Sequence, residues 1–233
     1  MDNSVIKTSP SASSDSIKMQ ERLAILLALI AGYIDATGLI KWKTYVSFMS
    51  GNTTSLGASL STDNFGIVIT SVTVLSCFLV GIYTGTCLSL SKRIKNQTLI
   101  FYLVSGILIL YTILAYFLNI NTLLSIGIVG FSMGIMNTIV TSVGKQKVNT
   151  DFVTGTLNSL ARNTAMLTMT KDKAEKKEYQ SNAIHLLLLW IGFLSGAFIA
   201  PFLLGYFGKW TLMIPGLLLM ICGILISKIN AKN

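Results

Sequence analysis

Residues 66–90 read GIVITSVTVLSCFLVGIYTGTCLSL and contain no Asp, Glu, Lys or Arg. A helix of about 20 apolar residues crosses the ~30 Å hydrocarbon core of a bilayer, because it satisfies its own backbone hydrogen bonds. This stretch therefore predicts a transmembrane helix. Five other stretches have the same character, at residues 23–40, 98–118, 122–144, 183–208 and 210–227.

The composition of the whole chain agrees with a membrane-embedded protein. The 233 residues are 52% hydrophobic and 12% charged, with a mean hydropathy of +0.67. A soluble domain has about 25% charged residues. Asp35 is the one formally charged residue within the six stretches. We therefore predict an all-α fold, a polytopic membrane helical bundle with six spans.

The basic residues predict how the chain is oriented. There are 18 Lys and Arg against 9 Asp and Glu, and they flank the apolar stretches instead of lining one face, which argues against nucleic-acid binding. All of them except Lys41, Lys43 and Lys209 lie in the N-terminal tail, after the second and fourth stretches, or at the C-terminus. By the positive-inside rule, both termini are expected in the cytoplasm.

The chain divides into a tail and one membrane domain. Residues 1–22 are Ser-rich and polar, which predicts a disordered cytoplasmic tail. The polar lead before a span-length stretch indicates an uncleaved signal anchor instead of a signal peptide. The membrane domain is expected over residues 23–228, with halves at 23–118 and 122–228 and a cytoplasmic loop at 145–182.

Three short matches recur in the same order in the two halves. The matched pairs are Gly32-Tyr33-Ile34-Asp35-Ala36 with Gly134-Ile135-Met136-Asn137-Thr138, Phe48-Met49-Ser50-Gly51 with Phe152-Val153-Thr154-Gly155, and Gly81/Gly85 with Gly192/Gly196. Each half contains three spans, and an odd number of crossings makes the second half enter from the opposite side. The pattern predicts a 3+3 inverted repeat, which is typical of secondary transporters.

Each half also carries a segment of glycine and hydroxyl residues. Residues 46–60 read VSFMSGNTTSLGASL, too short and too rich in hydroxyls to span alone, and too apolar at the start for a solvated loop. We predict a re-entrant or broken helix here and around residues 151–166. The polar side chains would either bind a polar ligand or hydrogen-bond neighbouring helices, and the sequence leaves both interpretations open.

Asp35 is the most unusual residue of the predicted spans. A carboxylate in hydrocarbon costs about 2.5–3.5 kcal/mol on insertion scales, so a function or a partner is expected. Burial favours its neutral form, which suits proton coupling. Two alternatives are a hydrated interfacial position paired with Lys41 or Lys43, and a pairing with Arg162.

The remaining features favour packing. The glycine pairs Gly81/Gly85 and Gly192/Gly196 are expected to let helices approach closely, and Pro201 and Pro215 are expected to kink the last two spans. The three cysteines and His185 fall within spans without a metal-binding pattern.

Four motifs resemble the YoaK-like family of bacterial membrane proteins, a domain of unknown function. They are Gly32-Tyr33-Ile34-Asp35-Ala36, Phe48-Met49-Ser50-Gly51-Asn52-Thr53, Gly134-Ile135-Met136-Asn137 and Phe152-Val153-Thr154-Gly155. The resemblance extends from about Arg22 to Ser227. Where the family has Thr-Gly-Asn, this chain has Ser50-Gly51-Asn52, which keeps the hydroxyl. The resemblance implies a multi-pass protein of the bacterial plasma (inner) membrane and supplies no substrate.

These observations favour a secondary transporter or permease for a small polar solute, proton-coupled through Asp35. The expected transport path is lined by Asp35, Ser50, Asn52, Thr53, Asn137, Thr154, Thr156 and Arg162. The alternatives are a channel-like pore and a non-transporting scaffold or accessory subunit.

An enzyme is not expected, because the spans hold neither a nucleophile–base pair nor a metal set. The chain also lacks the phosphate loop of an ATP-driven transporter. No cofactor is expected. The expected partners are the lipid bilayer and the solute, with a homo-oligomer left open.

Overall fold

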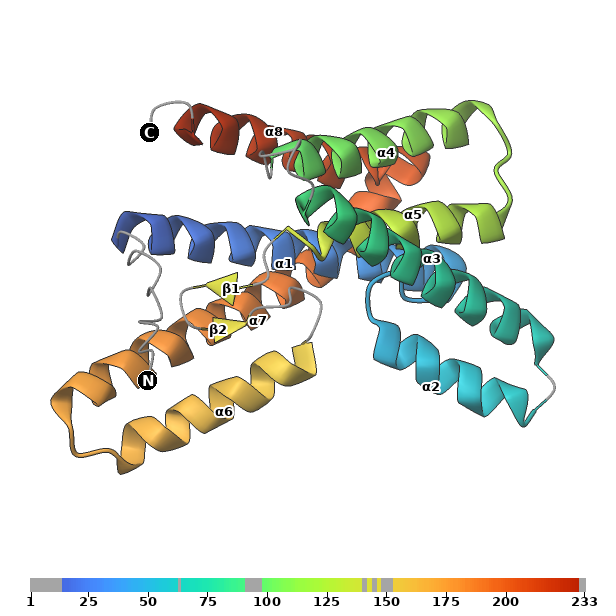
Figure 1. The fold of residues 1–233 in the computed structure, drawn as a ribbon. Coiled ribbons are helices and arrows are strands. Elements are labelled where there is room, and N and C mark those ends of the chain that lie inside the picture. The colour runs from blue at the N-terminus through green and yellow to red at the C-terminus, as the bar shows by residue number, and fades with distance from the viewer. Residues whose placement is uncertain are drawn as a thin grey trace, which may run out of the picture.

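The computed structural model describes residues 14–62, 64–90, 98–139, 142–143, 146–147 and 153–230. Most of the predicted tail, the bases Lys92, Arg93 and Lys95, and Phe152 of the second glycine motif lie outside these residues. The described chain is almost entirely helical (Figure 1). Its α-helices are α1 (Ser14–Trp42), α2 (Met49–Leu60), α3 (Phe65–Leu90), α4 (Thr98–Phe117), α5 (Thr122–Met136), α6 (Val153–Met169), α7 (Lys173–Phe207) and α8 (Met213–Asn230). A 3-10 turn, η1 (Gly208–Trp210), precedes α8, and β1 (Ser142–Val143) pairs antiparallel with β2 (Gln146–Lys147).

The apolar helices mark the chain as a membrane protein. Within the described residues, four helices are long and apolar enough to cross a bilayer, over Met19–Trp42, Phe65–Leu90, Thr98–Phe117 and Lys173–Trp210. Two shorter apolar helices cover Thr122–Met136 and Met213–Ser227. Every predicted span therefore corresponds to an apolar helix, but two of these are shorter than a typical span.

The predicted span at residues 122–144 is too long. Helix α5 ends at Met136, and Asn137 is its C-cap. The chain then turns, with the Thr138 hydroxyl donating to the Ile135 carbonyl oxygen at 2.8 Å. Residues 142–143 and 146–147, expected as span and loop, form the β1–β2 ribbon.

Two other helices extend into segments that the sequence analysis assigned to the tail and the cytoplasmic loop. Helix α1 includes residues 14–22. Helix α7 begins at Lys173, where the Asp172 side chain accepts a hydrogen bond from the Ala174 N–H at 3.0 Å. Such a cap satisfies a free N–H of the first turn, and lengthening an existing helix avoids the cost of nucleation.

The helices associate in pairs that join distant parts of the sequence. Helix α1 packs on α7, α3 on α5, and α4 on α8, while α2 lies against α3 and α6 against α7 as two helical hairpins. Figure 1 shows α2 and α6 running outward from the middle of the molecule toward opposite ends. At about 1.5 Å per residue, α2 is roughly 18 Å long, too short to cross a bilayer.

Glycines allow close backbone contact where α1 crosses α7. A Cβ atom on Gly32 would collide with the carbonyl oxygen of Phe193, and one on Gly196 would collide with that of Leu29. A Cβ on Gly192 would lie 2.9 Å from the Ile25 carbonyl oxygen. The two backbones can meet at this distance because these positions lack side chains.

The crossing of α3 and α5 is built in the same way. A Cβ on Gly134 would collide with the Phe78 carbonyl oxygen, and one on Gly81 with that of Phe131. A Cβ on Gly85 would lie 2.6 Å from the Thr138 hydroxyl oxygen.

The two prolines occupy different helical positions. Pro201 lies inside α7, which continues to Phe207. Pro215 lies in the first turn of α8, where a missing N–H costs little, so the predicted kink of the last span is not needed. The carbonyl of Thr211, four residues before Pro215, accepts a hydrogen bond from the Tyr33 hydroxyl at 3.1 Å. A side chain of helix α1 is thus hydrogen-bonded to the turn that leads into α8.

Candidate functional site

The chain reverses direction directly after α1. Lys43 has a left-handed backbone with φ of 57°, and the following residues fold back against α1. Gly38 leaves room for them, since a Cβ there would lie 2.9 Å from the Thr44 carbonyl oxygen and 3.1 Å from Val46 Cγ1. Residues 43–48, here called the connector, therefore lead back into the bundle before α2 begins.

Asp35 binds this connector. Its Oδ1 accepts hydrogen bonds from the N–H groups of Val46 at 2.8 Å and Ser47 at 2.7 Å, and its Oδ2 accepts one from the Ser47 hydroxyl at 2.7 Å. The carboxyl group is 3% exposed. Its position just before the first turn of α2 places it at the positive end of that helix. Backbone amides thus stabilise the carboxylate in place of a cation.

This placement decides between the alternatives for Asp35. The side chain is buried, so it is not a hydrated interfacial group. Among the described residues its partners are the connector donors, and it forms no ion pair with Lys41, Lys43 or Arg162.

Asn52 binds the other end of the connector. Its Oδ1 accepts a hydrogen bond from the Thr44 hydroxyl at 3.1 Å, and its Nδ2 donates to the Tyr45 carbonyl oxygen at 2.8 Å. Thr44, Ser47 and Asn52 are all buried. We call Asp35, Thr44, Ser47 and Asn52 the connector cluster.

The structure brings two of the predicted path residues together and leaves the others apart. Asp35 and Asn52 share the connector cluster with Thr44 and Ser47, which the sequence analysis did not select. The hydroxyls of these two residues, closely spaced before the glycine motif, were the available signal. On α2, Ser50 and Thr53 are exposed, and the Thr53 hydroxyl donates to the Met49 carbonyl oxygen of its own helix.

The predicted residues of the second half lie on α5 and α6. Asn137 is partly buried, and its buried Oδ1 has no hydrogen-bond partner among the described residues. Thr156 is partly buried, while Thr154 and Arg162 are exposed on α6. Helix α6 packs on α7, so Thr154, Thr156 and Arg162 belong to a different hairpin from α2.

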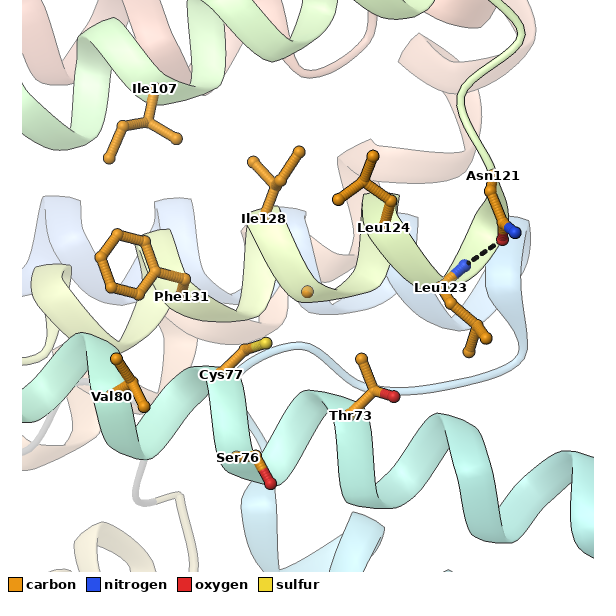
Figure 2. A pocket seen from close by; sticks show the side chains of 11 residues that line it. Thr73, Ser76, Cys77, Val80, Ile107, Asn121, Leu123, Leu124, Ile128 and Phe131 are labelled. Atoms are coloured by element: carbon orange, nitrogen blue, oxygen red, sulfur yellow. Dashed lines mark hydrogen bonds between the residues drawn. The ribbon is translucent and has the colours of Figure 1, made fainter.

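A separate pocket of about 870 Å³ lies between α3, α4 and α5 (Figure 2). Its walls include Thr73, Cys77, Val80, Ile107, Ile128 and Phe131. The Asn121 side-chain Oδ1 at one end accepts a hydrogen bond from the Leu123 N–H at 2.8 Å. The Thr73 hydroxyl donates to the Ile69 carbonyl oxygen of its own helix. Most of the lining residues are apolar, so the pocket is suited to apolar groups.

No three His, Cys, Asp or Glu side chains within the described part of the chain lie close enough to hold a metal ion. The thiols of Cys77, Cys87 and Cys222 are free.

The comparisons with known proteins give a family and no activity. A family model described as a protein of unknown function, DUF1275, matches residues 23–225. The chain belongs to this family. The match includes at least part of each of the six apolar helices and both glycine motifs, and it agrees with the YoaK-like resemblance. No curated protein and no solved structure matches the chain.

Proposed function

We propose that this member of the DUF1275 family is a secondary transporter or permease for a small polar solute, built as a 3+3 inverted repeat. The observation that carries the proposal is that the two glycine crossings are made by corresponding residues. In one, α1 presents Leu29 and Gly32 to α7, which presents Phe193 and Gly196. In the other, α5 presents Phe131 and Gly134 to α3, which presents Phe78 and Gly81.

These contacts give a register for the repeat. Exchanging α1 with α5 and α3 with α7 places Leu29 on Phe131, Gly32 on Gly134 and Phe78 on Phe193. The same exchange places Gly81 on Gly196, one helical turn away from the sequence alignment, which placed Gly81 on Gly192. Gly192 and Gly196 lie one helical turn apart on α7, so the sequence match and the crossing contacts support registers that differ by one turn.

The other helix pairs follow the same exchange. The α2–α3 hairpin corresponds to the α6–α7 hairpin, and α4 pairs with its counterpart α8. Three membrane spans in each half place the halves in opposite directions, and the opposite courses of α2 and α6 support this arrangement. With both termini in the cytoplasm of a bacterial cell, α2 and α6 lie toward opposite sides of the plasma membrane.

Asp35 provides the coupling group in this proposal. When its carboxylate takes up a proton at Oδ2, that oxygen becomes a donor, and the Ser47 hydroxyl must turn to accept. Protonation also removes the negative charge next to the first turn of α2. The position of α2 is thereby linked to protonation, with Asn137 as the uncharged counterpart in the other half. Ser50, Asn52, Thr53, Thr154, Thr156 and Arg162 are proposed to line the two ends of the path.

The test is transport by the purified protein in liposomes that contain a pH-sensitive dye. Amino acids, small sugars and organic acids are added singly, with and without an imposed pH gradient. We expect that one of these classes of solute causes proton movement when the wild-type protein transports it, and that the Asp35→Asn variant loses this coupling. Solute flux that responds to the gradient equally in the variant would remove Asp35 from the mechanism.

A non-transporting scaffold is the second candidate. It is favoured by the connector cluster, in which Asp35 and Asn52 are hydrogen-bonded to the chain itself. Absence of flux for every solute, together with a stoichiometric partner that co-purifies, would support the scaffold against the transporter.

A further inference from the structure

A polar cavity lies between α1 and α7, away from the connector cluster. It encloses about 300 Å³ and is lined by Glu21, Arg22 and Ile25 of α1 and by Ser181, Ile184, His185 and Leu188 of α7. This volume is at the lower end of the range for pockets that bind small molecules. The cavity combines an acid, a base, an imidazole and a hydroxyl with an apolar wall.

Among the described residues, the polar groups of the cavity form no hydrogen bond or ion pair with one another, although the Glu21 carboxylate lies within electrostatic range of His185. His185 is 6% exposed, and its buried Nε2 has no hydrogen-bond partner among the described residues. Glu21 and Arg22 are neighbours in one helix, so their side chains diverge, and neither forms an ion pair within the described part of the chain. A buried imidazole nitrogen without a partner is unfavourable, which indicates that a ligand supplies the missing contact.

The chemistry of these groups selects the ligand. A guanidinium binds phosphate or carboxylate oxygens with two parallel hydrogen bonds, and a carboxylate binds an ammonium group. An imidazole nitrogen adds a hydrogen bond to either group. We infer that this cavity binds a small zwitterion, its anionic group at Arg22 and its ammonium group at Glu21, with His185 as a hydrogen-bonding partner.

The position of the cavity favours a lipid headgroup as the source of the zwitterion. The apolar span of α1 begins at Met19, close to Glu21 and Arg22, and the exposed side chains of Ile184 and Leu188 continue along α7. Charged side chains beside the end of a span lie at the level of the headgroups. Phosphatidylethanolamine carries the required ammonium and phosphate, and a free zwitterion of the same chemistry is the other source. The site does not depend on the transport proposal.

The test is lipid binding to the full chain in detergent, followed by native mass spectrometry. The probes are dioleoylphosphatidylethanolamine, the corresponding phosphatidylcholine, whose ammonium has no N–H, and the corresponding phosphatidylglycerol, which has no ammonium. Free phosphoethanolamine is titrated by calorimetry. We expect phosphatidylethanolamine to bind best, and Glu21→Gln and Arg22→Gln each to weaken it at least about tenfold, as expected for a lost charge-assisted contact.

Matched controls separate binding from folding. Lys177→Gln and Glu178→Gln remove the same charges from exposed positions on α7 and are expected to leave binding unchanged. Arg22→Lys keeps the charge and is expected to bind better than Arg22→Gln. Circular dichroism and gel filtration establish that each variant is folded.

The outcomes distinguish the sources and can overturn the inference. Binding of phosphoethanolamine that depends on Glu21 and Arg22, without selective lipid binding, supports a soluble zwitterion. Equal binding of the three lipids and no binding of phosphoethanolamine would refute the site. The site would also be refuted if Glu21→Gln and Arg22→Gln bound phosphatidylethanolamine and phosphoethanolamine with the same affinity as the control variants.

Discussion

At the scale of single residues, Asp35 determines the path of the chain between α1 and α2. The connector offers two N–H groups and one hydroxyl, and the carboxylate accepts all three within 2.8 Å. A buried donor without an acceptor is costly. The residue therefore has a structural part in holding the connector, whatever its part in transport.

We predict that Asp35→Ala lowers the free energy of unfolding by about 3 kcal/mol or more, since it leaves three buried donors without acceptors. Asp35→Asn is expected to cost about 1 kcal/mol, because its carbonyl oxygen still accepts from Val46 and Ser47. Equilibrium unfolding in mixed detergent–SDS micelles measures both. Equal stability of the Ala and Asn variants would contradict the arrangement.

Asn52 gives a second prediction for the same connector. Asn52→Ala removes the hydrogen bonds to Thr44 and Tyr45 and is expected to cost about 1–2 kcal/mol. The matched control is Thr53→Ala, since Thr53 is exposed and bonds only within α2. It is expected to change stability by about 0.5 kcal/mol or less. A control variant as unstable as Asn52→Ala would indicate that α2 itself, and not its link to the connector, was damaged.

At the scale of elements, the two crossings depend on glycine because the backbones of the paired helices touch. The hydrogen of each glycine occupies the place where a Cβ would meet a carbonyl oxygen of the other helix. A rigid backbone atom cannot move aside as a flexible side chain can. Tertiary contact therefore requires glycine at the crossings, whereas other glycines on the same helices are not required by such contacts.

We predict that Gly32→Ala, Gly81→Ala, Gly134→Ala and Gly196→Ala each destabilise the protein by about 1–3 kcal/mol, the usual cost of overpacking. Gly106 is the matched control, because a Cβ there meets nothing within 4 Å. Gly106→Ala is expected to be neutral or to stabilise α4 by up to about 1 kcal/mol. Thermal unfolding in detergent compares the variants. A similar loss at Gly106 would show that glycine matters here for reasons other than the crossing.

The link between α1 and the start of α8 gives another prediction. The Tyr33 hydroxyl lies 2.6 Å from the Thr211 hydroxyl and donates to the Thr211 carbonyl oxygen. Tyr33→Phe is expected to cost about 1–2 kcal/mol, because it removes the hydrogen-bond partner of the buried Thr211. Tyr83→Phe, at a position 72% exposed, serves as the control and is expected to be neutral. Thermal unfolding in the same detergent measures both, and an equal change in both variants would refute the role of Tyr33.

At the scale of the whole molecule, the exchange of halves relates the turn after α2 to the turn after α6. These turns contain Ser61 and Lys171, both exposed. An inverted repeat places corresponding turns on opposite sides of the membrane. The sidedness of the two turns is therefore the direct test of the architecture.

We predict that Ser61→Cys is labelled by an impermeant thiol reagent from outside intact cells and that Lys171→Cys is labelled only after the membrane is opened. Cys77, Cys87 and Cys222 are first replaced by Ser, and this variant serves as the blank. Mass shifts of the purified protein measure the labelling. Labelling of both positions from the same side would refute the inverted repeat and, with it, the transporter proposal.

The sequence by itself determined that this protein lies in a membrane and that its apolar segments are helices. Long apolar runs that lack charges can only satisfy their backbone as helices in a bilayer, so the six apolar helices and the membrane class followed from composition and length. The repeated glycine motifs also predicted related segments in the two halves. These are local properties, read from neighbouring residues.

Only the tertiary structure decided where helices end and which polar groups meet. The end of α5 at Met136 depends on a turn in which Thr138 bonds back to its own helix, and apolar residues beyond it concealed that end. The bonds from Asp35 to Val46 and Ser47 require the left-handed turn at Lys43 and the space beside Gly38. The register of the crossings is set by carbonyl contacts between separate helices. A one-dimensional pattern does not specify such contacts, because they depend on how distant segments pack in space.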